Sequence, residues 1–238
     1  MTIINDPARA IDLIKSKRLL IFDFDGVLAD SVEVKTEAFA EVYKAYGSDV
    51  IKDVVAHHRN NGGMSRFDKF KHYHNTFLQQ NIDIQSLNEL SELFSQIVVD
   101  KVIKSAEIAH IGKFLEQCCE RGHLLAVNSA APTAEVIKII NARGLWGVFN
   151  EIYGSPGSKI DNFKAIKRDL SVDFNDCVFF GDASADFNAA QSVGMEFIGI
   201  GQTIAELLED TEGRWFGFDD FRDLVCGDGF KENWDYDC

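Results

Sequence analysis

Hydrophobic and polar residues follow two different patterns along the chain. After about residue 107, segments with apolar residues at helical spacing alternate with short apolar runs that are typical of buried strands. Another such run occupies residues 19–24. Between residues 32 and 105 the apolar residues recur only at helical spacing, which predicts a block of about four helices with a break at 60–63. The chain therefore combines a helix-and-strand region with an all-helical region.

The helix-and-strand region predicts a parallel sheet with helices on both faces. The expected strands are residues 19–24, 123–127, 150–153, 177–180 and 196–200. The expected helices are residues 6–16, 108–121, 133–143, 161–170 and 185–193, with two more near 203–209 and 218–225. Since a lone strand is not stable, the first strand must join the same sheet. We predict an α/β fold with a Rossmann-like core of residues 1–32 and 107–238 and an inserted all-helical domain of residues 33–106.

Composition and charge narrow the classes of partner. The 238 residues include 24 basic and 38 acidic side chains, and the resulting net charge of −14 argues against nucleic acid and favours small or neutralised ligands. No apolar run approaches the roughly 20 residues of a membrane span, and the N-terminal residues lack a signal-peptide apolar region. The five cysteines show no metal-binding spacing. We expect a cytoplasmic, monomeric protein with reduced thiols and no membrane partner.

Acidic residues stand where the first buried strand ends. In RLLIFDFDGVLADS (residues 18–31), Asp23 lies inside the end of the apolar run and Asp25 follows two residues later. Carboxylates are among the groups least often buried unless they are paired or bind a metal. The two-residue period of a strand places Asp23 and Asp25 on the same side. A helix cap does not explain an acid between Phe22 and Phe24, so this stretch indicates a functional site.

Three later segments add compatible side chains. One predicted strand is followed by Ser129, another by Asp182 and Asp186, and a Gly-Ser-Pro-Gly-Ser loop by Lys159. Ligands of open α/β sheets bind beyond the carboxyl ends of the strands, where these residues are expected to meet. Carboxylates so close together repel one another, and a hard cation with oxygen ligands relieves the repulsion. Mg²⁺ is the usual cation when a phosphate shares the site.

Each of these residues has a simpler interpretation when it is taken alone. An isolated Asp at a strand end is more often a cap or turn residue, and this is our interpretation of Asp30. Ser129 alone is most simply a turn serine, and Lys159 alone a solvated lysine. Asp182 and Asp186 could cap the following helix. The four segments together favour one shared site, because independent coincidences multiply.

The ordered set of motifs resembles the haloacid dehalogenase-like hydrolase superfamily, in its phosphatase branch. DFDGVLADS resembles its first motif, LLAVNSA its second, Lys159 its third and VFFGDASAD its fourth. The inserted helices resemble the C1-type cap of phosphoglycolate phosphatase and β-phosphoglucomutase relatives. The resemblance covers nearly the whole chain and implies that residues 33–106 form such a cap.

The resemblance also implies a role for each motif residue. Asp23 would be the nucleophile that forms an aspartyl-phosphate, and Asp25 would be the general acid and base. Ser129 would hydrogen-bond the phosphoryl group, and Lys159 would stabilise its charge. The implied ligands of Mg²⁺ are the side chains of Asp23 and Asp182, the backbone carbonyl of Asp25, and Asp186 as a ligand or as a residue that holds one.

The segment HHRNNGGMSRFDKFKHYH (residues 57–74) is basic within an acidic chain. We hypothesise that Gly62 and Gly63 form a tight loop that reaches toward the core site, and that Arg66, with Arg59, binds an anionic or hydroxyl-rich substrate. In the resembled family, the substrate-specificity loop of the cap lies about here. The alternative is a solvated helix face that offsets nearby acids. The histidines of this segment are expected to be surface or half-buried residues rather than metal ligands.

These features predict a Mg²⁺-dependent phosphatase for a small phosphorylated metabolite, such as a sugar phosphate or a phosphoglycolate-like compound, acting through an aspartyl-phosphate. A phosphomutase of the β-phosphoglucomutase kind would use the same residues, and the sequence does not distinguish the two. A non-catalytic sugar-phosphate-binding or regulatory protein on the same fold is a third alternative. The retained Asp23, Asp25, Lys159 and Asp182 argue against this last alternative.

Overall fold

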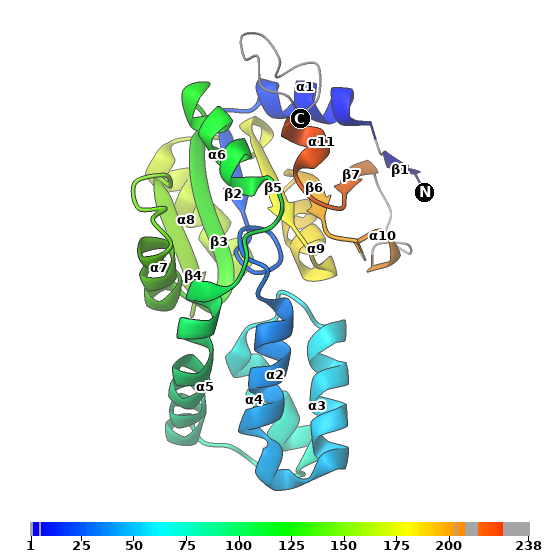
Figure 1. The fold of residues 1–238 in the computed structure, drawn as a ribbon, viewed down its shortest axis with the longest axis vertical. Coiled ribbons are helices and arrows are strands. Elements are labelled where there is room, and N and C mark those ends of the chain that lie inside the picture. The colour runs from blue at the N-terminus through cyan, green and yellow to red at the C-terminus, as the bar shows by residue number, and fades with distance from the viewer. Residues whose placement is uncertain (1, 5, 203, 208–213, 226–238) are drawn as a thin grey trace.

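The computed structural model describes residues 2–4, 6–202, 204–207 and 214–225. Within these residues, seven parallel strands form one sheet in the order β1-β7-β6-β5-β2-β3-β4 (Figure 1). The strands are β1 (Thr2–Ile4), β2 (Leu19–Phe22), β3 (Leu124–Pro132), β4 (Glu151–Ser155), β5 (Cys177–Gly181), β6 (Glu196–Ile200) and β7 (Arg214–Phe218). The sheet has β2 between β5 and β3, so the first strand of the predicted core joins the later strands as expected.

Helices cover both faces of the sheet because successive strand residues point in opposite directions. Leu20 and Phe22 face one hydrophobic cluster, whereas Leu19 and Ile21 face the other. The helices of the first face are α1 (Pro7–Ser16), α6 (Ile111–Glu120), α7 (Thr133–Ala142) and α11 (Arg222–Val225). The helices of the second face are α8 (Lys159–Leu170), α9 (Ser184–Ser192) and α10 (Ile204–Leu207). This arrangement confirms the predicted α/β fold.

The all-helical region lies between β2 and β3 in the chain and beyond one end of the sheet (Figure 1). Its helices are α2 (Val32–Val42), α3 (Ser48–Asn60), α4 (Arg66–His72) and α5 (Ile84–Lys104), with short helical turns at Lys44–Tyr46 and Tyr73–Phe77. Phe39 packs against Phe70, Tyr73 and Phe94, with ring centroids 4.4–5.8 Å apart. This aromatic centre gives the helical region a packed interior of its own. Among the described residues, no helix is long and apolar enough to cross a membrane.

The loop between α3 and α4 packs directly on the core. Gly63 has a φ of +74°, and a Cβ at this position would lie 3.0 Å from the Cβ of Ala185. A Cβ at Gly62 would come equally close to Ala183. Only a residue without a side chain fits such an approach, particularly at a positive φ. The two glycines therefore reach the core site, as the sequence hypothesis states.

The structure differs from the predicted elements mainly near the ends of the chain. Strands β1 and β7 pair with each other, and neither was predicted. The run RWFGF of β7 is short, and a short apolar run is recognised as a strand only when the sheet beside it is known. It ends in Phe218, where a helix over 218–225 was expected, and α11 occupies only the last part of that range. Helix α10 falls within the predicted 203–209, of which residues 203, 208 and 209 lie outside the described part of the chain.

The centre of the core generates a prediction about stability. Phe22 is fully buried and stacks on Phe180, with centroids 4.8 Å apart. We expect Phe22→Ala to lower the free energy of unfolding by about 3–5 kcal/mol, because the mutation leaves a cavity between strand and helices. Denaturant unfolding measures the loss. Leu93→Ala is the control, because Leu93 is 43% exposed and its loss should change stability by less than about 1 kcal/mol. Equal losses in both variants would contradict this view of the core.

Candidate active site

Asp23 is held at the end of β2 by the sheet itself. Its backbone N–H donates to the carbonyl of Phe180 at 2.8 Å, so the pairing with β5 extends one residue beyond the strand. The side chain is 3% exposed, and its Oδ2 lies 3.1 Å from Nζ of Lys159. Its Oδ1 is buried and has no hydrogen-bond partner. One carboxylate oxygen is therefore balanced by a cation, and the other is available to a ligand.

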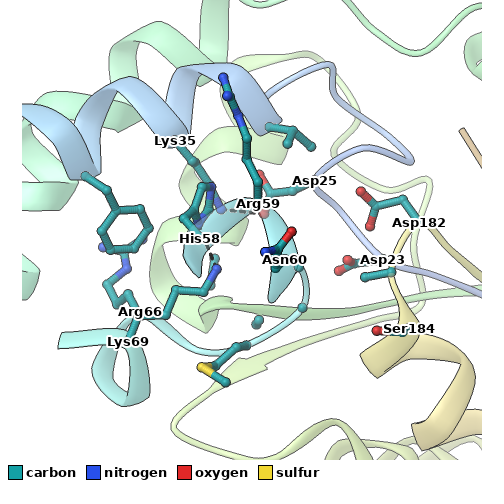
Figure 2. A pocket seen from close by; sticks show the side chains of 18 of the residues that line it. Asp23, Asp25, Lys35, His58, Arg59, Asn60, Arg66, Lys69, Asp182 and Ser184 are labelled. Carbon is teal, nitrogen blue, oxygen red and sulfur yellow. Dashed lines mark hydrogen bonds and ion pairs between the residues drawn. The ribbon is translucent and has the colours of Figure 1, made fainter. Parts of the chain in front are cut away.

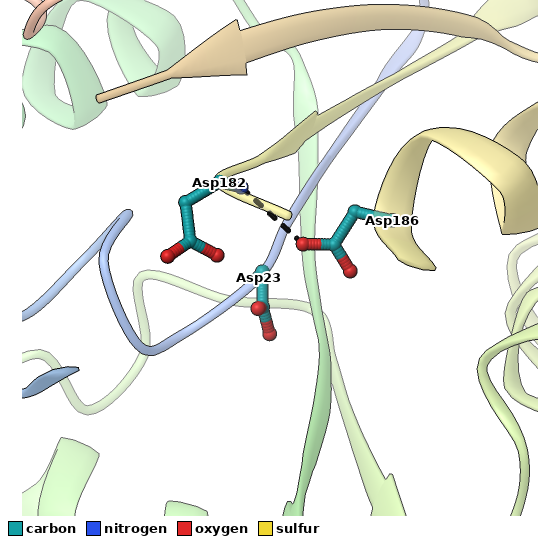
Figure 3. A group of neighbouring side chains, drawn as sticks. All are labelled: Asp23, Asp182 and Asp186. Carbon is teal, nitrogen blue, oxygen red and sulfur yellow. Dashed lines mark hydrogen bonds between the residues drawn. The ribbon is translucent and has the colours of Figure 1, made fainter. Parts of the chain in front are cut away.

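Asp182 and Asp186 bring two more carboxylates to the same place (Figure 3). One oxygen from each of Asp23, Asp182 and Asp186 lies within 4.8 Å of the others. Asp186 is fully buried, and its Oδ1 forms an ion pair with Lys159. Its Oδ2 accepts from the backbone N–H groups of Asp182 and Ala183 at 3.3 and 3.2 Å. Because both oxygens of Asp186 are engaged by the protein, this residue fixes the turn that presents Asp182.

The close approach of these carboxylates changes their affinity for protons. Burial raises the pKa of Asp23 to about 7 against the opposing effect of Lys159, and the nearby Asp186 and Asp25 raise it further. Burial, Asp186 and Asp23 likewise raise the pKa of Asp182 well above its ordinary value. The site therefore holds more negative charge than Lys159 alone can balance. Buried carboxylate oxygens, one of them without a partner, fit a divalent metal ion with oxygen ligands.

The turn after β2 is shaped by Gly26. This residue has a φ of +78°, and a Cβ there would lie 2.1 Å from Oδ2 of Asp182. No side chain fits at that distance, so the segment that carries Asp25 lies against Asp182 only because position 26 is glycine.

Asp25 is anchored by residues of the chain that follows it. Its Oδ1 accepts from the hydroxyl of Ser31 at 2.6 Å, and its Oδ2 forms an ion pair with Lys35 of α2. Burial alone would raise the pKa of Asp25, but the attraction of Lys35 and the hydrogen bonds outweigh it, and the pKa lies below its ordinary value. The structure therefore holds Asp25 as a carboxylate that can accept a proton.

Lys159 is the first residue of α8, and Ser129 lies within β3, which extends to Pro132, beyond the predicted 123–127. The predicted helix over 161–170 begins earlier, at Lys159, because the hydroxyl of Ser158 accepts from the N–H of Asp161. The side-chain amide of Asn128 donates to the carbonyl of Lys159 at 2.9 Å, which ties the middle of β3 to the start of α8. Burial alone would lower the pKa of Lys159, yet Asp186 and Asp23 raise it, so the side chain is a cation. Ser129 is buried, and its hydroxyl oxygen accepts from the N–H of Ala131.

A pocket of about 150 Å³ lies between this cluster and the inserted helices (Figure 2). Asp23, Asp25 and Asp182 line it on the core side. The inserted helices contribute both arginines that the sequence suggested and three further basic side chains that it did not single out as binding residues. These five lining residues are Lys35, His58, Arg59, Arg66 and Lys69.

The two arginines have different surroundings. Arg59 is exposed and pairs with Glu33 at 3.0 Å. Arg66 is 5% exposed, and its guanidinium donates to Glu135 of α7 at 2.5 Å and to Ser95 of α5 at 2.7 Å. The interpretation of this segment as a solvated helix face therefore applies to Arg59 and is wrong for Arg66.

The histidines of residues 57–74 are less exposed than expected. His58 and His74 are buried, so the expectation of surface or half-buried histidines is wrong for these two residues. Their burial follows from the aromatic interior of the inserted helices, because His58 packs on Phe39 and His74 on Tyr43. The helical spacing in the sequence was the available signal: His58 lies four residues after Val54, which is also buried in α3.

Comparisons with known proteins identify the family of this chain. Residues 20–200 match the family model of haloacid dehalogenase-like hydrolases. A phosphoglycolate phosphatase from Psychrobacter arcticus is 26% identical over 88% of this chain and 94% of its own length. The chloroplastic protein SUPPRESSOR OF QUENCHING 1 of Arabidopsis thaliana is 25% identical over 88% of this chain, which spans only 20% of that longer protein.

The fold is also similar to that of solved structures. The crystal structure of a β-phosphoglucomutase from Clostridium difficile has a TM-score of 0.72 and 20% sequence identity, with 87% of this chain and 93% of that chain covered. The family match spans the strands that carry Asp23, Ser129 and Asp182, together with Lys159 and the inserted helices. The chain therefore belongs to the haloacid dehalogenase-like hydrolases, the family that its four motifs resemble.

Proposed function

We propose that this protein is a Mg²⁺-dependent phosphatase that hydrolyses a small phosphorylated metabolite through an aspartyl-phosphate. The observation that carries the proposal is the cluster of Asp23, Asp182 and Asp186 around Lys159, with one oxygen of Asp23 free of any partner among the described residues. An anionic nucleophile approaches a phosphoryl group only where nearby cations offset the charge of both. The cluster supplies the nucleophile, one fixed cation and ligands for another.

The proposed reaction has two steps. An oxygen of Asp23 forms a bond to phosphorus while the bond from phosphorus to the leaving oxygen breaks, and Asp25 gives that oxygen a proton. Water then attacks the same phosphorus, gives its proton to Asp25, and releases phosphate with the carboxylate of Asp23 restored. Lys159 stabilises the phosphoryl oxygens, and Ser129 donates a hydrogen bond to them. The lowered pKa of Asp25 favours the carboxylate form that receives the proton of water in the second step. The first step therefore requires Asp25 to take up a proton before the leaving oxygen departs.

The metal ligands proposed are Asp23, Asp182 and the backbone carbonyl of Asp25. Asp186 is proposed to hold Asp182 in place, because its own oxygens already accept from Lys159 and two backbone N–H groups. When it is bound, Mg²⁺ would supply positive charge beside the phosphoryl group.

The inserted helices are proposed to act as a cap over the substrate. We propose residues 33–106 as this domain and residues 1–32 and 107–238 as the core, with hinges near 30–34 and 104–107. The ion pair between Arg66 and Glu135 joins the two parts and supports a closed arrangement that excludes water. Arg59 and Arg66 are proposed to contact the leaving group. A sugar phosphate and a phosphoglycolate-like compound both fit this proposal, as the names of the relatives suggest.

The cellular setting remains a prediction. Cys118, Cys119 and Cys177 are free, which supports reduced thiols and a cytoplasmic location. A monomeric state is likewise proposed from the sequence alone.

The role of Asp23 is tested by Asp23→Asn. An amide is a poor nucleophile, so hydrolysis of p-nitrophenyl phosphate with Mg²⁺ should fall by at least about a thousandfold. Mass spectrometry after rapid quenching should detect the added phosphoryl group in the wild type and not in the variant. Asp12→Asn is the matched control, because Asp12 is exposed on α1 and has no proposed role. Undiminished hydrolysis by Asp23→Asn would exclude this residue as the nucleophile.

The raised pKa of Asp23 predicts that metal binding depends on pH. A metal ion competes with the proton that Asp23 holds below about pH 7, so the affinity for Mg²⁺ should rise with pH. For one such group, the dissociation constant should fall about tenfold between about pH 6 and about pH 8. Isothermal titration calorimetry in buffers of different ionisation enthalpy measures both the affinity and the protons released. An affinity that falls with rising pH would contradict the proposed ligand set.

The product formed distinguishes a phosphatase from a phosphomutase. We expect a hexose monophosphate or phosphoglycolate, incubated with the protein and Mg²⁺, to yield inorganic phosphate. The phosphomutase alternative predicts an isomeric hexose phosphate without stoichiometric phosphate release, which phosphorus NMR resolves. A protein that binds these compounds and changes none of them would instead support the non-catalytic alternative.

A further inference from the structure

The basic side chains on the cap side of the pocket differ in whether a carboxylate already balances them. Lys35 pairs with Asp25, Arg59 with Glu33, and Arg66 with Glu135. Lys69 also lines the pocket, but among the described residues it forms no ion pair. Its side chain is 3% exposed, so solvent does not stabilise its charge. A buried ammonium without a counter-ion is costly, which indicates a position prepared for an anion.

The surroundings of Lys69 fix where its ammonium lies. Its Nζ is 2.8 Å from Nδ1 of His58 and 5.6 Å from the centroid of the Phe39 ring (Figure 2). Burial lowers the pKa of His58 to about 3, so the imidazole is neutral and its Nδ1 can accept a hydrogen bond from Lys69. Only one of the three donor hydrogens of the ammonium is used in this way. His58 therefore orients Lys69 without compensating its charge.

The environment of Lys69 disfavours its charged form, and an anion bound beside it would favour that form again. Burial and the nearby Lys35 lower the pKa of Lys69 to about 7. A carboxylate placed beside the ammonium would raise that pKa again and would replace the solvation that burial removes. Arg66 lacks this excess charge, because Glu135 already balances its guanidinium, which also donates to Ser95.

From this contrast we infer that Lys69, oriented by His58, binds a carboxylate on the leaving group of the substrate. The inference rests on the proposed function and deepens it, because it selects phosphorylated carboxylic acids over sugar monophosphates, whose leaving group is uncharged, and over sugar bisphosphates. One carboxylate brings a single negative charge to a single uncompensated cation. A second phosphoryl group would bring up to two charges to a wall where the other three cations are already paired.

Steady-state kinetics of the full chain with Mg²⁺ tests the substrate class. The probes are phosphoglycolate, a hexose monophosphate, a hexose bisphosphate and p-nitrophenyl phosphate. The wild type should show its highest kcat/KM with phosphoglycolate. In Lys69→Met, the ratio of kcat/KM for phosphoglycolate to that for p-nitrophenyl phosphate should fall by about ten- to a hundredfold, the range expected for a charged hydrogen bond. Lys69→Arg keeps the charge and should recover part of that ratio.

A control lysine separates this effect from general loss of positive charge. Lys101→Met removes a lysine from α5 that pairs with Glu37 at the surface, and its ratio should stay within about twofold of the wild type. A ratio unchanged in Lys69→Met, or a wild type that prefers the hexose bisphosphate, would overturn the inference. Equal losses on both probes would assign Lys69 to structure or chemistry and would also overturn it.

Equilibrium binding separates this inference from the proposed phosphatase activity. Phosphonoacetate and methylphosphonate cannot be hydrolysed as phosphate esters, and they differ in the carboxylate. Calorimetry with Mg²⁺ should show at least about tenfold tighter binding of phosphonoacetate to the wild type, and Lys69→Met should abolish the difference. If the wild type hydrolyses none of the esters but keeps this preference, the phosphatase proposal fails and the carboxylate site stands. Equal affinities for the two phosphonates in the wild type would reject the site.

Discussion

The structure depends on three carboxylates, two buried and one half-buried, that are gathered around one lysine. Asp23, Asp182 and Asp186 lie within reach of a shared ion, and among the described core residues it is Lys159 that pairs with Asp23 and Asp186. Such an excess of negative charge destabilises a folded chain unless the surroundings are rigid and a cation joins it. The rigidity comes from the parallel sheet, where Phe22, Phe179 and Phe180 are fully buried immediately before the acids. The rigid hydrophobic core therefore holds the carboxylates of the acidic site in place.

The sequence was sufficient to predict the core and the acidic cluster because both depend on short-range patterns. A buried strand that ends in Asp23 and Asp25 is visible in seven consecutive residues. The carboxyl ends of parallel strands meet at one edge of the sheet, so the predicted fold places Asp182 close to Asp23. Lys159 is the first residue of α8 because Ser158 caps that helix. This cap is a local signal in the sequence, and it indicates a helix start two residues earlier than the predicted one.

The residues that the sequence did not reveal depend on contacts between distant segments. Glu135 lies 69 positions from Arg66, and its helical spacing to the buried Ile139 indicates that it faces the interior without indicating its partner. Lys69 and His58 come from two helices whose relative positions are set by the aromatic packing of Phe39 and Phe70. Strand β7 is likewise recognised only through its pairing with β6 and β1. In each case the missing information is which surfaces face each other, and a single sequence does not specify it.

The inserted helices are part of the chemical site, because they set the charge of core residues. Lys35 belongs to α2, yet it is the main reason that the pKa of Asp25 lies low despite burial. Glu135 belongs to the core, yet it neutralises Arg66 of α4. Moving the helices away from the sheet would separate Arg66 from Glu135, and the loss of this buried ion pair opposes opening until water solvates both charges. The pKa of Asp25 is therefore set at the boundary between the two parts of the chain, where the inferred carboxylate site at Lys69 also lies.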